Sequence, residues 1–308
     1  MEHKVDGSKY AVKKLEKISE NIAESEVEEA KQMCSMLHAN VCRYYNAWQE
    51  DGFVHIRMEL CDKDLATWIN TRNRVLFGNE QPREDIEPIL ERWIDLSWDR
   101  SPSGTRPPLP SQQTWFRSIK SRGTNDFLKG LLKGVRYLHD DKGVAHQDLH
   151  PKNVLLKIDY AQNTITAKIC DFGLARRKNT TAFSEDRRFE NRPSPTTVDS
   201  FCQDLESLGR IMMRMYYPLY GNAMNDLLSK LQKSSRNHET ELNCDFRDVW
   251  PNQALWIKRL LSGEEVKPTA AQMLDQGMRS ETFPSEKYKK GLEDGEHEQR
   301  VACYVQQT

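Results

Sequence analysis

The segment at residues 146–153 constrains this chain more than any other part of it. It reads His-Gln-Asp-Leu-His-Pro-Lys-Asn, and an Asp-Phe-Gly triplet follows at residues 171–173. The stretch between them contains two short apolar runs around a polar turn, which predicts a β-hairpin. Two loops joined by this hairpin would carry Asp148, Asn153 and Asp171. The triplet alone is a weak signal, whereas the longer pattern upstream is much more specific.

These three side chains suit phosphoryl transfer from ATP. That reaction needs one carboxylate to orient the attacking hydroxyl, and oxygen ligands that hold magnesium ions on the phosphates. Asp148 is the candidate for the first role, and Asn153 and Asp171 are the candidates for metal binding. Each of them alone could be a turn-forming residue. Because all three occur together in this order, the functional interpretation is favoured.

Composition argues against several other classes of protein. The 308 residues carry a net charge of −1, so no overall field favours nucleic acid or an acidic membrane. The sequence contains no run of about 18 apolar residues, so no membrane segment is expected. Its N-terminus does not resemble a signal peptide. Seven scattered cysteines without a Cys-x-x-Cys pair argue against zinc and disulfides, and favour a reducing, cytoplasmic location.

Hydrophobic periodicity divides the chain into a mainly β part and a mainly helical part. The first part, residues 1–60, is expected to contain strands at 9–15, 41–48 and 53–60 and a helix at 22–37. The second part, residues 61–280, is expected to contain an insert at about 72–123 and a long amphipathic helix before residue 146. Its other expected elements are hairpin strands at 154–158 and 164–170 and helices at 202–216, 224–233, 253–261 and 270–274. Residues 281–308 form a charged tail.

Over residues 5 to 275 the chain resembles the protein kinase superfamily. The resemblance rests on the two loops, on Ala-Val-Lys at 11–13, on Met-Glu-Leu-Cys at 58–61 and on Asp-Leu-Glu-Ser-Leu-Gly at 204–209. The sequence of residues 38–48 is similar to that of the kinases that phosphorylate the alpha subunit of translation initiation factor 2. Residues 146–149 look closer to the stress-sensing kinase–ribonucleases. This resemblance implies an α+β, bilobal fold with ATP and magnesium bound between the lobes.

The resemblance also assigns roles around the nucleotide. Lys13 would contact the α- and β-phosphates, with Glu29 orienting it, although Glu26 and Glu28 are rivals for that role. Adenine would be bound by the side chains of Ala11, Leu155 and the gatekeeper Met58, and by backbone groups of Glu59 and Cys61.

Other matched positions imply structural roles. Asp204 would brace the loop at 146–153 from a central helix. His146 and Phe172 would stack with apolar residues such as Met33 in a packed column. We therefore expect His146 to belong to the core, despite a side-chain pKa that suits proton transfer.

Several features depart from the family pattern. The glycine-rich strand pair that precedes the lysine strand in kinases is not found in the few residues before Gly7, so the small lobe is expected to be truncated. Gln147 stands where kinases that need loop phosphorylation carry Arg, and His150 stands where serine/threonine kinases carry Lys. Residues 190–193, Glu-Asn-Arg-Pro, replace the Ala-Pro-Glu motif, and Lys267 replaces its distant Arg partner.

Two functions follow from these observations. The retained set of Lys13, Glu29, Asp148, Asn153 and Asp171 favours an ATP- and magnesium-dependent serine/threonine kinase with a protein substrate, in stress or translation control. The departures favour a pseudokinase, which would act as a nucleotide-binding scaffold or decoy and dimerise with a copy of itself or with a related kinase. Retention of Asp148 favours catalysis, because a nucleotide-binding switch does not need it.

Overall fold

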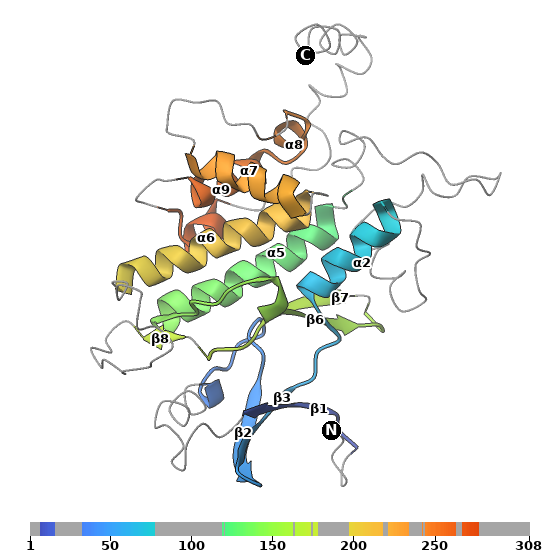
Figure 1. The fold of residues 1–308 in the computed structure, drawn as a ribbon, viewed down its shortest axis with the longest axis vertical. Helices are drawn as coiled ribbons and strands as arrows, with labels where there is room; N and C mark the ends of the chain where they lie inside the picture. The colour runs from blue at the N-terminus through green and yellow to red at the C-terminus, as the bar shows by residue number, and fades with distance from the viewer. Residues whose placement is uncertain are drawn as a thin grey trace, which may run out of the picture.

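The structure is a computed structural model that describes residues 7–15, 33–77, 119, 121–162, 164–173, 175–177, 197–217, 221–233, 242, 244–262 and 267–276. A three-stranded antiparallel sheet lies at one end of the molecule, and helices make up most of the other end (Figure 1). This arrangement confirms the expected α+β architecture, with a small β-rich lobe and a larger helical lobe.

The small lobe is built on one sheet with the order β1–β3–β2. Its strands are β1 (Tyr10–Leu15), β2 (Tyr44–Glu50) and β3 (Phe53–Glu59). The β2–β3 turn contains Asp51 and Gly52, both with positive φ, which is the conformation that tight hairpin turns require. Register places Ala11 opposite Met58 and Lys13 opposite Ile56. The sheet thus fixes which residues of β1 and β3 share a face.

The larger lobe begins with short β elements. The strands β4 (Lys63–Asp64), β6 (Val154–Asp159) and β7 (Thr164–Ile169) form one sheet, and β5 (Val144–Ala145) pairs with β8 (Arg176–Arg177). The β6–β7 hairpin joins the loop at residues 146–153 to the loop that starts at Asp171. The loop that carries Asp148 and Asn153 and the loop that carries Asp171 therefore lie at the two ends of one hairpin.

Helices account for the rest of this lobe. They are α2 (Leu65–Phe77), α5 (Ser121–Arg136), α6 (Thr197–Tyr216), α7 (Gly221–Lys233), α8 (Cys244–Val249), α9 (Pro251–Leu261) and α10 (Ala270–Asp275). A π-helical turn at Tyr137–Asp141 continues α5, and a 3-10 turn spans Pro151–Asn153. Within the described part of the chain, no helix is both long enough and apolar enough to cross a membrane.

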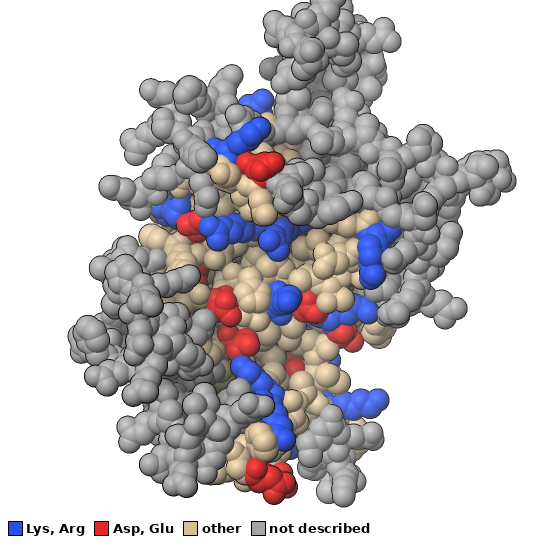
Figure 2. Space-filling view, in the orientation of Figure 1, with Lys and Arg blue, Asp and Glu red and all other residues tan. Residues whose placement is uncertain are grey.

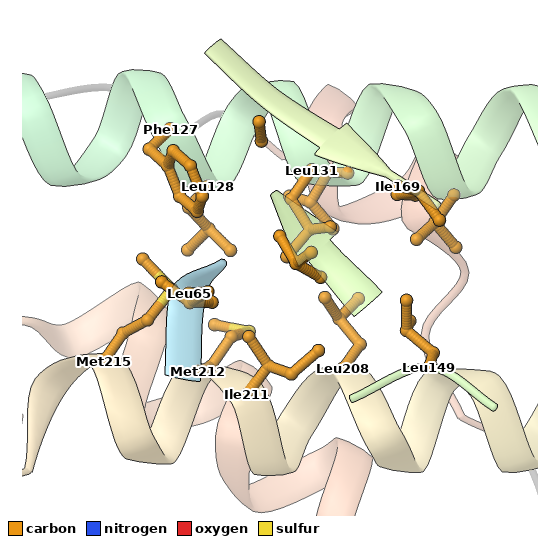
Figure 3. Close-up of a cluster of buried hydrophobic side chains, with 14 of the residues drawn as sticks. Leu65, Phe127, Leu128, Leu131, Leu149, Ile169, Leu208, Ile211, Met212 and Met215 are labelled. Carbon is orange, nitrogen blue, oxygen red and sulfur yellow. The ribbon is translucent and has the colours of Figure 1, made fainter. Parts of the chain in front are cut away.

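The main core lies between α5 and α6 (Figure 3). Leu128 and Leu131 of α5 face Leu208 and Ile211 of α6, and all four side chains are fully buried. Apolar residues three or four positions apart fall on one face of a helix, which is why each helix buries a single stripe. Leu149 reaches the same cluster from the loop at 146–153. Hydrophobic burial thereby anchors that loop.

A turn at residues 38–42 attaches the small lobe to the larger one. The N–H of Cys42 donates to the carbonyl of Ile169 at 2.8 Å, and the N–H of Ile169 donates to the carbonyl of Asn40 at 2.9 Å. The Asn40 amide also donates to the carbonyl of Ala167 at 3.0 Å. Gly134 of α5 leaves room for this turn, because a Cβ there would lie 2.9 Å from the Asn40 oxygen.

The element bounds correct several expectations. The strand expected at 41–48 begins at Tyr44, because residues 40–42 bond to Ile169 of β7 instead. The interruption expected from residue 72 is wrong for its first residues, since α2 continues to Phe77. Helix α8 was not expected. The helix expected at 22–37 falls mostly outside the described residues, and the domain limits remain predictions.

Candidate functional site

Asp148 and Asn153 lie against each other within the loop at residues 146–153. The Asn153 side-chain Nδ2 donates to the Asp148 carbonyl at 2.9 Å and to its carboxylate Oδ2 at 3.1 Å. Pro151 starts the 3-10 turn that ends at Asn153, and the Asn153 N–H closes it on the carbonyl of His150. This turn holds the amide of Asn153 against the carboxylate and leaves the amide oxygen available as a ligand.

Asp204 of α6 fixes the start of the same loop from behind. Its carboxylate accepts the N–H of His146 at 2.6 Å and the N–H of Gln147 at 2.7 Å, and it lies 2.9 Å from Nε2 of His139. Gln147 has a φ of 62°, a value that is strained for a residue with a side chain. A buried carboxylate that accepts both amides stabilises this conformation. Asp204 thus braces the loop as expected.

His146 is a structural residue rather than an exposed base. The N–H of Asp148 points at its Nδ1 (3.3 Å), so Nε2 carries the hydrogen and donates to the carbonyl of Cys170 at 2.9 Å. Burial lowers the pKa of His146, which keeps the ring neutral. Its ring lies 4.9 Å from the ring of Phe172, in a core that also contains Met33. The expected core role of His146 and Phe172 is confirmed.

Lys13 and Asp171 meet between the lobes. Nζ of Lys13, on β1, donates to Oδ1 of Asp171 at 2.6 Å. Asp171 also has a positive φ, 63°. The preceding residue, Cys170, donates its N–H to the carbonyl of Asn153 at 2.9 Å, so the two loops are directly bonded. The structure therefore brings Lys13, Asp148, Asn153 and Asp171 together.

The residues expected around adenine come from both lobes. Ala11 and Met58 face each other across β1 and β3, and both are partly buried. Leu155 lies on β6 in the larger lobe and packs against the core. Glu59 and Cys61 flank Leu60 in the segment that joins the lobes.

This connecting segment is tied at several points. The N–H of Glu59 donates to the carbonyl of Arg43 at 2.7 Å, so this backbone group is already paired within the protein. The Glu59 carboxylate accepts Nζ of Lys168 at 2.8 Å and is directed at β7. The Cys42 thiol donates to the Glu59 carbonyl at 3.7 Å. These contacts hold Glu59 against residues 42–43 and against Lys168 of β7.

Glu29, the expected partner of Lys13, lies outside the described residues, as do its rivals and residues 190–193. Lys267 is described. Its Nζ donates to the carbonyls of Leu260 at 2.7 Å and Ser262 at 3.0 Å, which stabilises the C-terminal end of α9.

Gln147 and His150, two residues that depart from the kinase family pattern, have defined contacts. The Gln147 side chain donates to Oγ of the buried Ser200, on α6, at 2.6 Å. Nε2 of His150 lies 3.6 Å from Oδ2 of Asp148, and both side chains are about 41% exposed. Gln147 is therefore directed into the protein, whereas His150 stands at the solvent-exposed edge of the Asp148 carboxylate.

Sequence reasoning missed several contacts of this site. Tyr44, on β2, contacts Asp171 through its hydroxyl, and Ser200 and Lys168 bind Gln147 and Glu59. Alternation along a strand predicts that one of the adjacent Tyr44 and Tyr45 points inward, which is the available signal, although the β2–β3 register shifts between Tyr44 and Asn46. Nothing local indicates what an inward hydroxyl would bind.

Charges of both signs occur on the visible face of the described residues. Acidic and basic side chains are interspersed over the middle of the visible face, so no single sign dominates it (Figure 2). A pocket of about 500 Å³ is lined mainly by the β6–β7 hairpin, including Lys157, Tyr160 and Lys168, together with Glu59. Of the expected nucleotide-binding residues, Glu59 is the one that lines this pocket.

Comparison with known proteins agrees with this geometry. The family model described as "Protein tyrosine and serine/threonine kinase" matches residues 1–196. The eIF-2-alpha kinase GCN2 of Arabidopsis thaliana is 24% identical over 306 residues, which cover 88% of this chain and 23% of that protein.

Two further relatives match the other expected groups. The serine/threonine-protein kinase/endoribonuclease IRE1b of Arabidopsis thaliana is 27% identical over 184 residues, or 58% of this chain and 18% of that protein. The interferon-induced, double-stranded RNA-activated protein kinase of Mus musculus is 26% identical over 211 residues, or 63% of this chain and 30% of that protein.

This chain thus spans less than a third of the length of each of these three relatives. The resemblance to translation-factor kinases and to kinase–ribonucleases is confirmed. Because the family model covers more than half of the residues, the chain belongs to the protein tyrosine and serine/threonine kinase family.

Proposed function

We propose that this chain is an ATP- and magnesium-dependent serine/threonine protein kinase. The observation that carries the proposal is the convergence of Lys13, Asp148, Asn153 and Asp171, joined by the 2.6 Å Lys13–Asp171 bond, the Cys170–Asn153 backbone bond and the Asn153–Asp148 bonds. Each of these groups matches a role that phosphoryl transfer requires.

Each of these residues has a proposed role in the transfer. Asp148 accepts the proton of the substrate hydroxyl. The hydroxyl oxygen bonds to the γ-phosphorus of ATP, while the bond from that phosphorus to the oxygen of ADP breaks. Asn153 keeps the carboxylate in orientation through the bond to Oδ2. Lys13 brings a positive charge to the phosphates, and we propose Glu29 as its second partner. Ala11, Met58 and Leu155 contact adenine, together with the backbone of Glu59 and Cys61.

The oxygen donors available fit magnesium. The carboxylate of Asp171 and the amide oxygen of Asn153 are hard ligands, and magnesium commonly takes one or two such groups and completes its shell with phosphate and water. Within the described part of the chain, no cluster of three or more His, Cys, Asp and Glu forms a protein-only metal cage. When bound, the metal would neutralise charge that develops on the transferred phosphoryl group.

A test separates transfer from binding. The wild-type chain and Asp148→Asn are incubated with radiolabelled ATP and magnesium, and label is measured on the chain and on a generic basic protein. We expect transfer by the wild type alone, and equal signal from both would remove the catalytic claim. Thermal shift with ATP and magnesium measures binding independently, because a ligand that binds the folded state stabilises it.

His150 favours a second candidate, a pseudokinase. An imidazole beside Asp148 stands where a lysine is expected on the γ-phosphate, and it lacks the permanent charge of lysine. Nucleotide-dependent stabilisation without label transfer would support this alternative.

We propose a substrate in translation control, because two relatives are named as eIF-2-alpha kinases. From the family we also propose that the chain dimerises with a copy of itself or with a related kinase, and from the cysteine pattern we propose a cytoplasmic location.

A further inference from the structure

Tyr44 connects the small lobe to the residue expected to bind metal. It is the first residue of β2 and is 4% exposed. Its hydroxyl accepts the N–H of Asp171 at 3.1 Å. Its ring meets the ring of Phe172 edge-on, with 6.2 Å between the centroids. Tyr44 therefore contacts two consecutive residues of the Asp-Phe-Gly loop, one through a polar atom and one through its ring.

The contact falls where the backbone is strained. Asp171 has a φ of 63°, in a region that residues with a side chain rarely adopt and that persists when surrounding contacts enforce it. The neighbouring backbone is held from the larger lobe, by the bonds from Cys170 to Asn153 and from Ala175 to Phe172. The Tyr44 hydroxyl supplies a bond to the strained residue itself, from the smaller lobe.

Packing alone does not require this hydroxyl. A phenylalanine would fill nearly the same space and keep the edge-on contact with Phe172. Burying a hydroxyl costs free energy unless it forms a hydrogen bond. Burial also raises the pKa of Tyr44 well above its usual value, so the group is a neutral phenol. The bond to the Asp171 N–H offsets the cost of burial and gives the hydroxyl a specific role.

We infer that Tyr44 is a positioning residue for the proposed phosphoryl transfer: its hydroxyl holds the Asp171 backbone so that the carboxylate faces Lys13 and a bound magnesium–nucleotide. The inference rests on the proposed function, since it assigns Asp171 the role of metal ligand. It adds that the small lobe positions Asp171 in two ways: through the hydrogen bond from the Asp171 N–H to the Tyr44 hydroxyl, and through the bond between Lys13 and the Asp171 carboxylate.

The test uses Tyr44→Phe, with Tyr45→Phe as the matched control. Tyr45 loses the same hydroxyl but lies 40% exposed, next to Tyr10 and Arg43. Nucleotide affinity is measured by calorimetry with magnesium and with EDTA. We expect Tyr44→Phe to weaken magnesium-dependent binding about tenfold, the effect of one lost hydrogen bond, and to leave binding in EDTA unchanged. Tyr45→Phe should change neither.

Amide hydrogen exchange supplies a readout that needs no nucleotide. The Asp171 N–H should exchange faster in Tyr44→Phe than in the wild type, while the N–H of Cys170 keeps its protection through Asn153. If Tyr44→Phe unfolds too easily to assay, protection of the Asp171 amide in the wild type still tests the bond, and an unprotected amide would refute it.

The other outcomes are equally decisive. Unchanged magnesium dependence in Tyr44→Phe overturns the positioning role, and tighter binding or faster transfer would mean that the hydroxyl restrains Asp171 instead. If the wild type transfers no phosphate but Tyr44→Phe still weakens magnesium-dependent nucleotide binding, the positioning of Asp171 by Tyr44 stands while the proposed catalysis fails. A wild type with equal affinity in magnesium and EDTA overturns the metal role of Asp171 and this inference together.

Discussion

Lys13 and Asp171 are separated by 158 positions in the sequence and yet form a 2.6 Å hydrogen bond between the two lobes. The side chains are 31% and 40% exposed, so solvent screens the pair and its contribution to folding is small, about 0–1 kcal/mol. Its importance should instead appear in nucleotide binding. We predict that Lys13→Met lowers the affinity for magnesium–ATP at least tenfold, or about 1.4 kcal/mol, in a fluorescence titration.

Lys14→Met is the matched control for this prediction. Lys14 is the next residue on β1, and its amine lies over the ring of Phe53, 3.5 Å from the centroid, on the opposite face of the strand. The control should bind nucleotide like the wild type. Equal losses in both variants would show that Lys13 has no specific contact with the phosphates.

Asp204 is predicted to dominate the stability of the loop at residues 146–153. Asp204→Ala leaves the buried N–H of His146 and the partly buried N–H of Gln147 without their acceptor, at about 1–3 kcal/mol each, so urea unfolding should show a loss of about 3 kcal/mol or more. Glu206→Ala on the same helix removes the pair with Arg210, which is solvent-exposed, and should cost at most about 0.5 kcal/mol. Similar losses in the two variants would contradict the bracing role.

Local elements of this fold were predictable because their signals are local. Alternation over residues 9–15 and 53–60 indicated strands, and β1 and β3 occupy Tyr10–Leu15 and Phe53–Glu59. The same reasoning located the β6–β7 hairpin to within a residue or two. By contrast, the contact of the Tyr44 hydroxyl with Asp171 joins residues that share no local pattern, so it required coordinates.

Two errors show how tertiary contacts override local patterns. The insert was expected to interrupt the helical pattern from about residue 72, but α2 continues to Phe77. Arg72 is 2% exposed, since its guanidinium donates to the carbonyls of Met215 and Arg214 at the end of α6. Similarly, Val41 looked like the start of a strand, but the neighbouring backbone pairs with Ile169 in the other lobe.

Gly134 should be intolerant of a side chain. A Cβ there would lie 2.9 Å from the Asn40 carbonyl oxygen and 2.9 Å from Cδ1 of Ile169, and this oxygen is held by its bond to the Ile169 N–H. Overpacking costs about 1–3 kcal/mol, which outweighs the roughly 1 kcal/mol that alanine gains over glycine in a helix. We predict that Gly134→Ala destabilises the fold in urea unfolding, whereas the exposed neighbour Lys133→Ala changes stability by at most about 0.5 kcal/mol. A more stable Gly134→Ala would mean that the turn at 38–42 moves freely.

Cys61 should be the thiol whose reactivity reports nucleotide binding. A hydrogen bond from the Cys42 thiol lowers the pKa of Cys61, while the same bond and burial raise the pKa of Cys42. Burial raises the pKa of Cys170 to about 12. Because the thiolate is the reactive form, iodoacetamide should modify Cys61 much faster than Cys42 or Cys170, and saturating magnesium–ATP should protect it.

Cys34 is the internal control for that experiment. It is exposed and is not among the residues expected to bind nucleotide, so its modification, followed by peptide mass spectrometry, should not depend on nucleotide. If nucleotide protects Cys34 and Cys61 equally, or protects neither, then adenine does not bind beside residues 59–61.

His38 should make folding stability depend on pH below neutrality. Burial lowers the pKa of His38 from 6.5, although Asp141 opposes this shift, and the neutral ring stacks on Tyr137 and accepts the N–H of Asn40 at Nδ1. The unfolded chain therefore takes up a proton first as the pH falls through about 6.5, so the free energy of unfolding must decrease below that pH. His146, which is also buried and neutral, acts in the same direction. His38→Phe keeps the stacking but cannot titrate, and urea unfolding between pH 7.5 and pH 5 should give it a shallower pH dependence than the wild type. Parallel curves for the two proteins would show that His38 does not contribute.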